Sequence, residues 1–339
     1  MENNDLELNK QTKNLKDNSA EKKFSLEFEM GRNEQGEMVT GDLAEMGHLL
    51  IAGCTGSGKS VFLHNMILNL AQKYSTDDLE LILVDTKHTE FGCYKNLPCA
   101  YLCKDNIELF EYYKNTKELY ENLIGEYKNI DEYNKSAKVK NGETQQLPHI
   151  VIIVDEFIIL LSNNKREYEE LFANMKNDLG IHFVLATQNP NGLTKKMINS
   201  FSNKISFYLY DNLAKKFTGC LDAETLNRSG EMLFYSENSK QVRLQGNYIS
   251  EKQIKNGVTG VIKKDKYLGR AMEIFFEKGD VCAEYLQETL NINEVHAYRI
   301  IYNLYSLGYV SDFEDEGNAK VLLTLEQFKN NFGEDFSSE

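Results

Sequence analysis

Five apolar runs lie along the N-terminal part of the chain, and longer stretches of helical patterning separate them. Each run is continuously apolar rather than alternating, which is typical of strands that are buried on both faces. Such strands between helices indicate an α/β fold, in which helices cover both sides of a mostly parallel sheet. The runs occupy residues 48–53, 79–85, 149–156, 181–188 and 204–209.

The segments around these runs complete a first domain, which we place at residues 23–250. An alternating stretch with a central turn predicts a hairpin over 23–45. The longest predicted helix covers 106–136, and a polar loop covers 138–148. Residues 1–22 mix charged residues with Asn, and we expect them to form a disordered tail.

The pattern changes after residue 250, where three helical stretches and two short strand-like stretches follow one another. Three helices and a hairpin predict a winged helix, a variant of the helix-turn-helix arrangement. The predicted helices are 267–278, 282–290 and 293–307, and the strands flank 315–317. The predicted winged-helix domain covers 267–324, between a linker over 251–266 and a C-terminal tail over 325–339.

A glycine-rich stretch joins the first apolar run to a helical pattern and fits Gly-x-x-x-x-Gly-Lys-Ser. Its backbone N–H groups would surround the phosphates of ATP, and the N-terminus of the following helix adds a favourable field. Lys59 would reach the β- and γ-phosphates, and the Ser60 hydroxyl would bind Mg²⁺. The predicted nucleotide-binding residues are Gly53, Cys54, Thr55, Gly56, Ser57, Gly58, Lys59, Ser60 and Val61.

Two acids end the third apolar run, and a polar pair ends the fourth. Beside a phosphate-binding loop, Asp155 would face the Mg²⁺ ion and Glu156 would polarise the attacking water, which hydrolysis requires. Thr187 and Gln188 would sense the γ-phosphate, and we count Gln188 with the catalytic set of Lys59, Asp155 and Glu156. The alternative is a plain strand end whose acids only serve solubility.

The composition limits the size of the core and the cellular locations that we expect for the protein. The chain has 339 residues, 41% of them hydrophobic, which is enough for a sizeable core. It has no apolar run long enough to cross a membrane and no signal-peptide core, so a cytoplasmic protein without membrane insertion is expected. Cys93, Cys99 and Cys103 lack a second cluster at zinc-site spacing, and we expect them to be small buried residues.

The ordered series of motifs resembles the motor portion of the FtsK/SpoIIIE family, part of the FtsK–HerA group. The resemblance runs through "GDLAEMGHLLIAGCTGSGKS", "LILVDTKHTEF", "LPHIVIIVDEFIILL", "GIHFVLATQNP", "SGEMLFY" and "VRLQGNYIS", and the winged-helix segment is similar too. It implies a RecA-like ATPase that assembles as a ring, usually a hexamer, and moves double-stranded DNA through its pore. It assigns nucleotide-site roles to Lys59, Ser60, Asp155, Glu156 and Gln188, and a supporting role to Asp85 and Lys87.

The chain also departs from the family pattern. Ring ATPases present an arginine to the neighbour's γ-phosphate, yet no arginine lies between Arg166 and Arg228. The candidates to replace it are Lys176, Lys204, Arg228 and Arg243. Where family members carry membrane helices and a long linker, this chain shows neither, so membrane anchoring is not implied.

The net charge of −14 requires any DNA-binding surface to be local. Residues 188–216 hold five lysines and one acid, which suits a pore that grips the DNA backbone, with Lys195 and Lys196 as candidates. Residues 262–314 hold six Lys/Arg against nine Asp/Glu, so the winged helix is poor in cations. His296, Arg299 and Lys320 are its candidate DNA contacts, and a winged helix used for protein contacts is the alternative.

These patterns favour an ATP-driven translocase of double-stranded DNA, which we expect to serve a plasmid, a phage or another mobile element. Two alternatives stay open. One is an ATP-switched DNA-binding adaptor for replication or conjugation, and the other is a protein-secretion motor of the same ATPase group.

Overall fold

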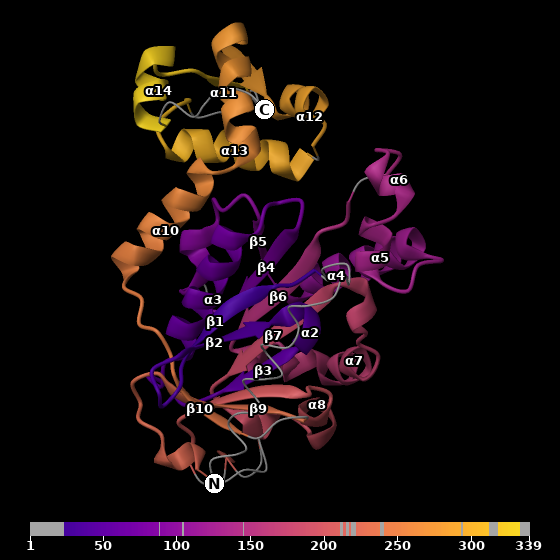
Figure 1. Ribbon diagram of the computed structural model, residues 1–339, viewed down its shortest axis with the longest axis vertical. Helices are drawn as coiled ribbons and strands as arrows, with labels where there is room; N and C mark the ends of the chain where they lie inside the picture. The colour runs from indigo at the N-terminus through magenta and orange to yellow at the C-terminus, as the bar shows by residue number, and fades with distance from the viewer. Residues whose placement is uncertain are drawn as a thin grey trace.

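A ten-stranded sheet forms the centre of the molecule (Figure 1). The computed structural model describes residues 24–332, with gaps at 88, 104, 145, 211–212, 215–216, 218–221, 238–240, 293 and 312–317. The strand order is β2-β1-β10-β9-β8-β3-β7-β6-β4-β5. Neighbours from β8 to β5 are parallel, and those from β8 to β2 are antiparallel. The predicted tail 1–22 lies outside the described residues.

The strands are β1 Glu27–Arg32, β2 Met38–Asp42, β3 Leu49–Ala52, β4 Leu79–Asp85, β5 Ala100–Cys103, β6 His149–Asp155, β7 Ile181–Thr187, β8 Asn203–Phe207, β9 Glu231–Ser236 and β10 Val242–Gln245. The five predicted parallel strands and the β1–β2 hairpin are confirmed. Strands β5, β9 and β10 were not predicted from the sequence, and they occupy the edge and the antiparallel side of the sheet.

The α/β part of the chain, residues 24–250, carries helices on both faces of this sheet. They are α2 Leu43–Met46, α3 Lys59–Lys73, α4 Asn106–Ile124, α5 Ile130–Asn134, α6 Ala137–Lys140, α7 Leu161–Ala173 and α8 Lys195–Asn199. In β3, Leu49 and Ile51 join one apolar core with α3, while Leu50 and Ala52 join a second core with α4 and α7. Burial on both faces explains why the strand is continuously apolar.

The long helix predicted over 106–136 is interrupted. Helix α4 ends at Ile124, where Gly125 adopts φ 44° and donates its N–H to the carbonyl oxygen of Glu121 at 3.1 Å. This left-handed conformation favours glycine and ends the helix. A short turn then leads to α5, and α6 opens the segment predicted to be a loop.

Most of the linker predicted over 251–266 is helical, because residues Glu251–Lys263 form helix α10. Ser250 and Gln253 form a reciprocal capping box at its start. Gly257 lies against α3, since a Cβ atom there would stand 3.1 Å from Leu68 Cδ1. Helix α10 contains two glycines, and for this reason its helical pattern of apolar residues was not recognised in the sequence. The buried residues of that pattern are Ile254, Val258, Val261 and Ile262.

A small C-terminal unit follows α10 and lies beside the β4–β5 end of the sheet (Figure 1). It contains α11 Lys266–Lys278, β11 Asp280–Cys282, α12 Ala283–Leu290, α13 Glu294–Ser306, β12 Asn318–Lys320 and α14 Leu325–Phe332. Strands β11 and β12 pair antiparallel, and Val310 bridges to Val321. The predicted turn at 315–317 lies outside the described residues.

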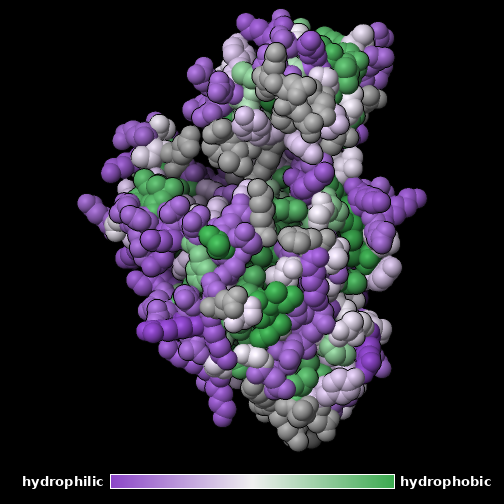
Figure 2. Space-filling view, turned by 180° about the vertical axis from the view of Figure 1, so that it is seen from behind, coloured by the Kyte–Doolittle hydropathy of each residue, from purple (hydrophilic) through white to green (hydrophobic). Residues whose placement is uncertain are grey.

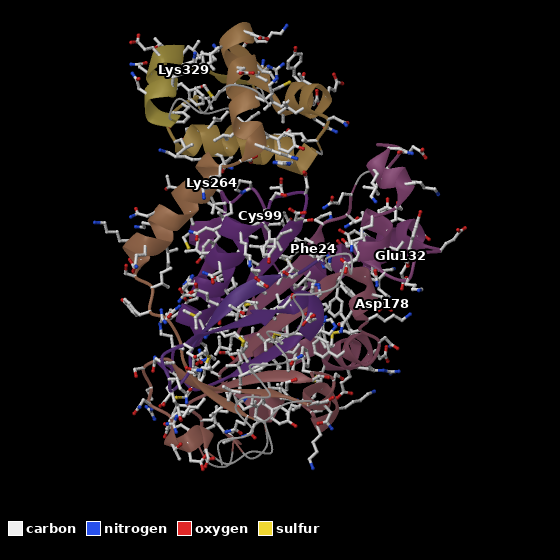
Figure 3. All side chains as sticks on the ribbon, viewed as in Figure 1. Phe24, Cys99, Glu132, Asp178, Lys264 and Lys329 are labelled. Atoms are coloured by element: carbon white, nitrogen blue, oxygen red, sulfur yellow. The ribbon has the colours of Figure 1, made fainter. Side chains whose placement is uncertain are left out.

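Helix α14 corrects the prediction of a tail from residue 325. Phe328 is 1% exposed, and its ring lies 5.8 Å from that of Phe276 and 5.4 Å from that of Tyr309. The unit also contacts the α/β part, because Lys266 pairs with Asp77. Figure 3 shows Lys264 where α10 meets this unit.

Two of the three predicted buried cysteines are buried. Cys99 and Cys103 are each 4% exposed, and Figure 3 shows Cys99 near the end of the α/β part closest to the C-terminal unit. Cys93 is exposed, which corrects the prediction. It lies in a 3₁₀ turn whose flanking residues, Phe91 and Tyr94, fill the core, so the turn directs Cys93 outward.

Hydrophilic residues cover most of the face seen in Figure 2, and hydrophobic residues gather in patches between them. No helix among the described residues is long and apolar enough to span a membrane.

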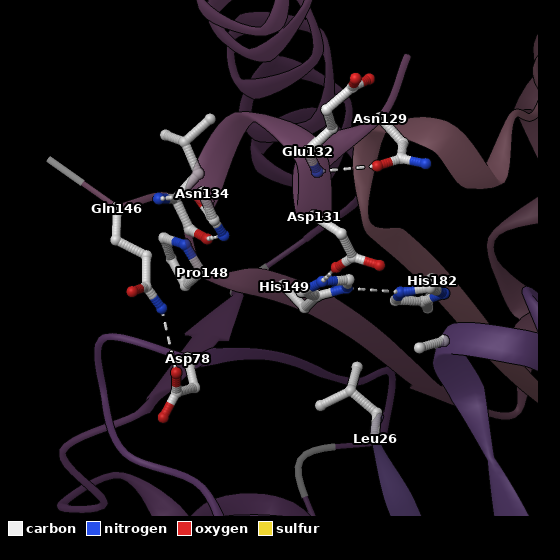
Figure 4. Close-up of polar contacts among 12 residues, drawn as sticks. Leu26, Asp78, Asn129, Asp131, Glu132, Asn134, Gln146, Pro148, His149 and His182 are labelled. Carbon is white, nitrogen blue, oxygen red and sulfur yellow. Dashed lines mark hydrogen bonds and ion pairs between the residues drawn. The ribbon is translucent and has the colours of Figure 1, made fainter. Parts of the chain in front are cut away.

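A chain of polar contacts joins β6 and β7 at the end where these strands begin (Figure 4). His182 Nδ1 donates to the carbonyl oxygen of Gly47 at 2.9 Å, and its Nε2 lies 3.1 Å from His149 Nδ1. His149 Nε2 lies 3.2 Å from Asp131 Oδ1. Burial lowers the pKa of His182 to about 3 and that of His48 to about 4. The fold therefore holds two neutral, buried imidazoles.

Acid is expected to destabilise the fold through His48. Its Nδ1 accepts from the N–H of Phe183 at 3.2 Å, so protonation breaks this hydrogen bond. The unfolded chain binds the proton near pH 6.5 and the folded chain only near pH 4, so stability present above pH 6.5 is lost as the pH falls toward 4. The loss amounts to roughly 3 kcal/mol.

Urea unfolding at several pH values would measure this effect. His48→Asn keeps an acceptor for Phe183 at the position of Nδ1 but does not titrate, so it should make the loss of stability between pH 6.5 and 4 shallower, and the part contributed by His182 should remain. An equally steep loss in the variant would show that His48 is not the responsible group.

Candidate nucleotide site

The glycine-rich loop lies between β3 and α3, at the carboxyl edge of the parallel strands. Gly53 donates its N–H to the carbonyl oxygen of Thr187 at 3.2 Å, and Cys54 donates to that of Tyr208 at 2.9 Å. The two strands beside β3 therefore anchor the loop from opposite sides. This is the strand–loop–helix context that phosphate binding requires.

Gly230 packs directly onto this loop, a contact that the sequence did not reveal. Its N–H donates to the carbonyl oxygen of Ser57 at 3.2 Å. Gly58 has φ 111°, and a Cβ atom there would lie 2.7 Å from the Cα atom of Gly230. The family motif "SGEMLFY" contains Gly230, and this position was the only indication in the sequence.

Lys59 is 5% exposed, and its ammonium group lies within the loop. Nζ donates to the carbonyl oxygens of Gly53 at 2.6 Å and Cys54 at 3.2 Å. Burial lowers the pKa of Lys59, and the carboxylates of Glu156 and Asp155 oppose that shift. A phosphate chain would supply the negative charge that a buried ammonium group needs.

Asp155 ends β6 directly opposite Asp85 of β4 and is 5% exposed. Burial raises the pKa of Asp155 to about 6, and the nearby carboxylates of Glu90 and Glu156 add to this shift. A divalent cation beside Asp155 would favour its ionised form. One carboxylate with a hydroxyl and phosphate oxygens is an ordinary Mg²⁺ environment.

Glu156 follows Asp155 with φ 55° and ψ 56°, a conformation rare for a residue with a side chain. Its Oε1 accepts from Thr187 Oγ1 at 3.1 Å and from the N–H of Gln188 at 3.0 Å. Lys87 Nζ lies 3.7 Å from its Oε2. Three groups thus orient a carboxylate that is 5% exposed.

Gln188 connects this carboxylate to the phosphate-binding loop. Its backbone N–H binds Glu156, while its side-chain Oε1 accepts from Thr55 Oγ1 at 2.7 Å. A movement of Thr55 would therefore reach Glu156 through a single residue. The sequence predicted the position of Gln188 but not this hydrogen bond.

Asp85 has a structural place beside the site. Its carboxylate accepts from the N–H groups of Lys87 at 3.2 Å, Glu90 at 2.7 Å and Phe91 at 2.9 Å. It thereby fixes the turn that presents Lys87 to Glu156. The supporting role near the nucleotide stays a prediction for Asp85 and Lys87.

The described residues fit a nucleoside triphosphate. Ser57 Oγ is buried without a hydrogen-bond partner among the described residues, in the loop where phosphate oxygens would be received. Gly56 has φ 74° and no atom within 4 Å of where its Cβ atom would lie, so that side of the loop is open. Ser60 and Val61 lie in the first turn of α3, where the backbone N–H groups and the helix dipole favour an anion.

Comparisons with known proteins agree with this geometry. The FtsK/SpoIIIE family model matches residues 12–105. The DNA translocase FtsK of Clostridium tetani is 31% identical over 344 residues, which is 88% of this chain and 46% of that protein. The FtsK of Treponema pallidum is 35% identical over 272 residues, 74% of this chain and 33% of that protein. The chain belongs to the FtsK/SpoIIIE family.

The chain spans less than half the length of these FtsK relatives. Solved structures support the same fold. The cytoplasmic domain of the type VII secretion ATPase EccC of Thermomonospora curvata superposes with a TM-score of 0.58 at 25% identity, covering 70% of this chain and 31% of that one. The conjugation coupling protein TcpA of pCW3 superposes with a TM-score of 0.59 at 22% identity, covering 72% of this chain and 73% of that one. The chain therefore has the fold of a P-loop ATPase of the FtsK–HerA type.

The structure separates the four candidates for the missing arginine of this FtsK/SpoIIIE chain. Lys204 is 6% exposed and donates to the carbonyl oxygen of Phe201, so it is not available to a neighbouring subunit. Arg243 Nε pairs with Glu231 at 2.6 Å. Arg228 lies over the ring of Tyr208 in its own subunit, and Lys176 is exposed. A contact of Lys176 with the γ-phosphate of a neighbouring subunit stays a prediction.

The candidate DNA contacts are scattered. Lys195 and Lys196 are exposed on α8, and Lys320 is exposed on β12. The ring of His296 lies edge-on to Tyr267 at 5.0 Å, and its Nε2 is 3.6 Å from Asp265 Oδ2. His296 therefore faces the start of α11 rather than the surface, which argues against its predicted DNA contact.

The side chains of three other basic residues considered for DNA binding are not among those that the structure describes. Arg299 belongs to α13, but its side chain lies outside the described part of the structure. Lys215 and Lys216 lie outside the described residues altogether. Because Lys204 is buried, Lys195 and Lys196 of α8 are the exposed lysines among the described residues of the stretch 188–216.

Proposed function

We propose that this chain is an ATP-driven translocase of double-stranded DNA that works as a ring of identical subunits, with six as the expected number. The observation that carries the proposal is the chain of contacts from Thr55 through Gln188 to Glu156. It connects the phosphate-binding loop to the carboxylate placed for hydrolysis. The similarity to proteins named DNA translocase FtsK supports DNA as the substrate.

Hydrolysis is assigned to four groups. Lys59 would hold the β- and γ-phosphates, while Ser60 and Asp155 would hold Mg²⁺, which neutralises charge on the phosphates. Glu156 would accept a proton from the attacking water. Its contacts with Thr187 and the N–H of Gln188 hold the carboxylate in one direction, which reduces the entropic cost of reaching the reactive arrangement.

The DNA-binding part of the proposal rests on charge. The exterior is acidic overall, with a net charge of −14, so DNA would be held by a local basic surface. Gln188 directly follows β7, and a short connection leads from it to the exposed Lys195 and Lys196. A change at the γ-phosphate would reach α8 along this connection.

We further propose that the C-terminal unit acts as a winged helix that helps to load or orient the ring. Helices α11, α12 and α13 together with the β11–β12 pair are the elements of such a module. Lys320 and Arg299 remain its candidate DNA contacts. A plasmid, phage or mobile-element substrate is a prediction from the sequence alone.

Steady-state ATP hydrolysis with and without long double-stranded DNA tests the proposal. DNA should stimulate hydrolysis, and the double variant Lys195→Glu/Lys196→Glu should lose this stimulation by roughly tenfold or more while its DNA-independent rate stays native. Lys252→Glu/Lys255→Glu on α10 is the matched control, because it makes the same charge change at exposed lysines of another helix.

Each outcome discriminates between functions. Absence of stimulation by DNA, with ATP still hydrolysed, would contradict the translocase. Stimulation by a secreted polypeptide instead would favour the secretion motor. ATP binding without turnover would favour the ATP-switched adaptor. Equal loss in both double variants would show that overall charge, rather than α8, controls DNA binding.

A further inference from the structure

Arg228 lies over the rings of Tyr208 and Tyr210, which meet edge-on, and we call these three side chains next to the phosphate-binding loop the stack. The Cζ atom of Arg228 lies 4.4 Å from the ring centroid of Tyr208 and 5.7 Å from that of Tyr210. Arg228 Nη2 donates to the hydroxyl of Tyr210 at 3.1 Å. Tyr210 is 54% exposed, and Arg228 is exposed as well. An unburied cluster of planar groups is not needed for the core.

The backbone fixes this stack against the loop at two points. The carbonyl oxygen of Tyr208 accepts the N–H of Cys54 at 2.9 Å. Two residues beyond Arg228, Gly230 donates its N–H to the carbonyl oxygen of Ser57 at 3.2 Å. Both segments that carry the stack are thus hydrogen-bonded to the loop itself, one near its start and one near its end.

The orientation of a bound nucleotide follows from the other side of the site. Glu156 and Gln188 follow β6 and β7, which lie on one side of β3, so the γ-phosphate must point there. Strand β8 pairs with β3 on the opposite side, and Tyr208 directly follows β8. The nucleoside end of the molecule therefore extends toward the stack.

We infer that Tyr208, Tyr210 and Arg228 form the surface that binds the nucleobase of the nucleotide held by the loop. This inference rests on the proposed ATP binding and identifies the base subsite. Tyrosine rings and a guanidinium plane attract the flat face of a base by stacking and cation–π contact. Stacking does not read the edges of a base, so ATP and GTP should bind with similar affinity.

The assignment also changes the interpretation of Arg228. Its side chain is bound to the tyrosines of its own subunit, whose hydroxyl groups raise its pKa. It then serves the nucleotide of its own subunit rather than the γ-phosphate of a neighbour. With Arg228 assigned to the nucleobase, Lys176 is the remaining exposed residue among the four candidates for contacting the neighbour's γ-phosphate.

Equilibrium titration of the full chain with Mg²⁺–ATP and, separately, with inorganic triphosphate tests the inference. Tyr210→Ala and Arg228→Ala should each weaken ATP binding by about tenfold and leave triphosphate binding unchanged. Tyr210→Phe keeps the ring and should bind ATP within about twofold of the native chain. Tyr285→Ala is the matched control, because Tyr285 is 38% exposed, has Lys278 Nζ 5.4 Å from its ring centroid and belongs to α12 of the C-terminal unit.

The outcomes separate the possible roles. Equal weakening of ATP and triphosphate binding in Arg228→Ala would place this residue at the phosphates and overturn the inference. Unchanged ATP binding in both alanine variants would also overturn it. Native ATP binding with weakened DNA binding would assign the stack to DNA bases instead. Because the titration contains no DNA, its result stands even if the proposed translocation fails.

Discussion

Replacing Glu156 by glutamine is expected to lower ATP hydrolysis by at least about a hundredfold while ATP remains bound. Glutamine has the same shape, and its Oε1 can still accept from Thr187 Oγ1 and the N–H of Gln188. It cannot take a proton from water, and it does not pair with Lys87. Single-turnover hydrolysis and equilibrium ATP binding, measured side by side, check both halves of this expectation.

Glu90→Gln is the control for this variant. It also removes a negative charge near Asp155, but the carboxylate of Glu90 lies 3.4 Å from His64 Nε2 and not beside the loop. Its turnover should stay within about threefold of native, which is under 1 kcal/mol of barrier. Native-like ATP turnover in Glu156→Gln would show that Glu156 does not take part in hydrolysis. An equal loss of turnover in Glu90→Gln would show that the loss of a negative charge near Asp155, rather than of the Glu156 carboxylate itself, lowers the rate.

The centre of the fold and the nucleotide site could be predicted because their information is local in sequence. A strand buried on both faces must be continuously apolar, so β4, β6 and β7 were visible as runs. The carboxyl ends of parallel strands meet at one edge, so residues that follow such runs come together there. Lys59, Asp155, Glu156 and Gln188 were found in this way.

What the sequence could not supply depends on contacts between distant segments. The hydrogen bond from Thr55 to Gln188 spans 133 positions, and the one from Gly230 to Ser57 joins segments that carry no shared pattern. Lys204 belongs to a basic stretch, yet it is the second residue of a strand buried in the sheet and its side chain folds onto Phe201. Charge counted along a sequence does not report which lysines reach the surface.

The C-terminal misassignments have a different cause. The glycines of α10 and the polar residues of α14 weakened helical patterns that tertiary contacts stabilise. Gly257 is suited to its place because a side chain there would press on Leu68. The same property that makes a glycine look like a linker residue thus permits close packing of two helices.

Gly58→Ala is expected both to destabilise the fold and to reduce nucleotide affinity, each strongly. Its φ of 111° strains any residue with a Cβ atom, which costs about 1–3 kcal/mol. The added atom would also stand 2.7 Å from the Cα atom of Gly230, a backbone atom that cannot rotate away. The loop must then shift, which moves the N–H groups that receive the phosphates, and we expect at least about a hundredfold loss of ATP affinity.

Gly56→Ala separates the conformational strain of a positive φ from the close contact with Gly230. Gly56 also has a positive φ, 74°, but no atom lies within 4 Å of the Cβ position, so only the conformational strain applies. The new methyl group would instead point into the open side of the loop. We therefore expect a smaller fall in the unfolding midpoint than for Gly58→Ala, together with weaker ATP binding. If both variants lowered the midpoint equally, the close approach of Gly58 to Gly230 would contribute nothing to stability, and the loop would be held by its hydrogen bonds to Thr187, Tyr208 and Gly230.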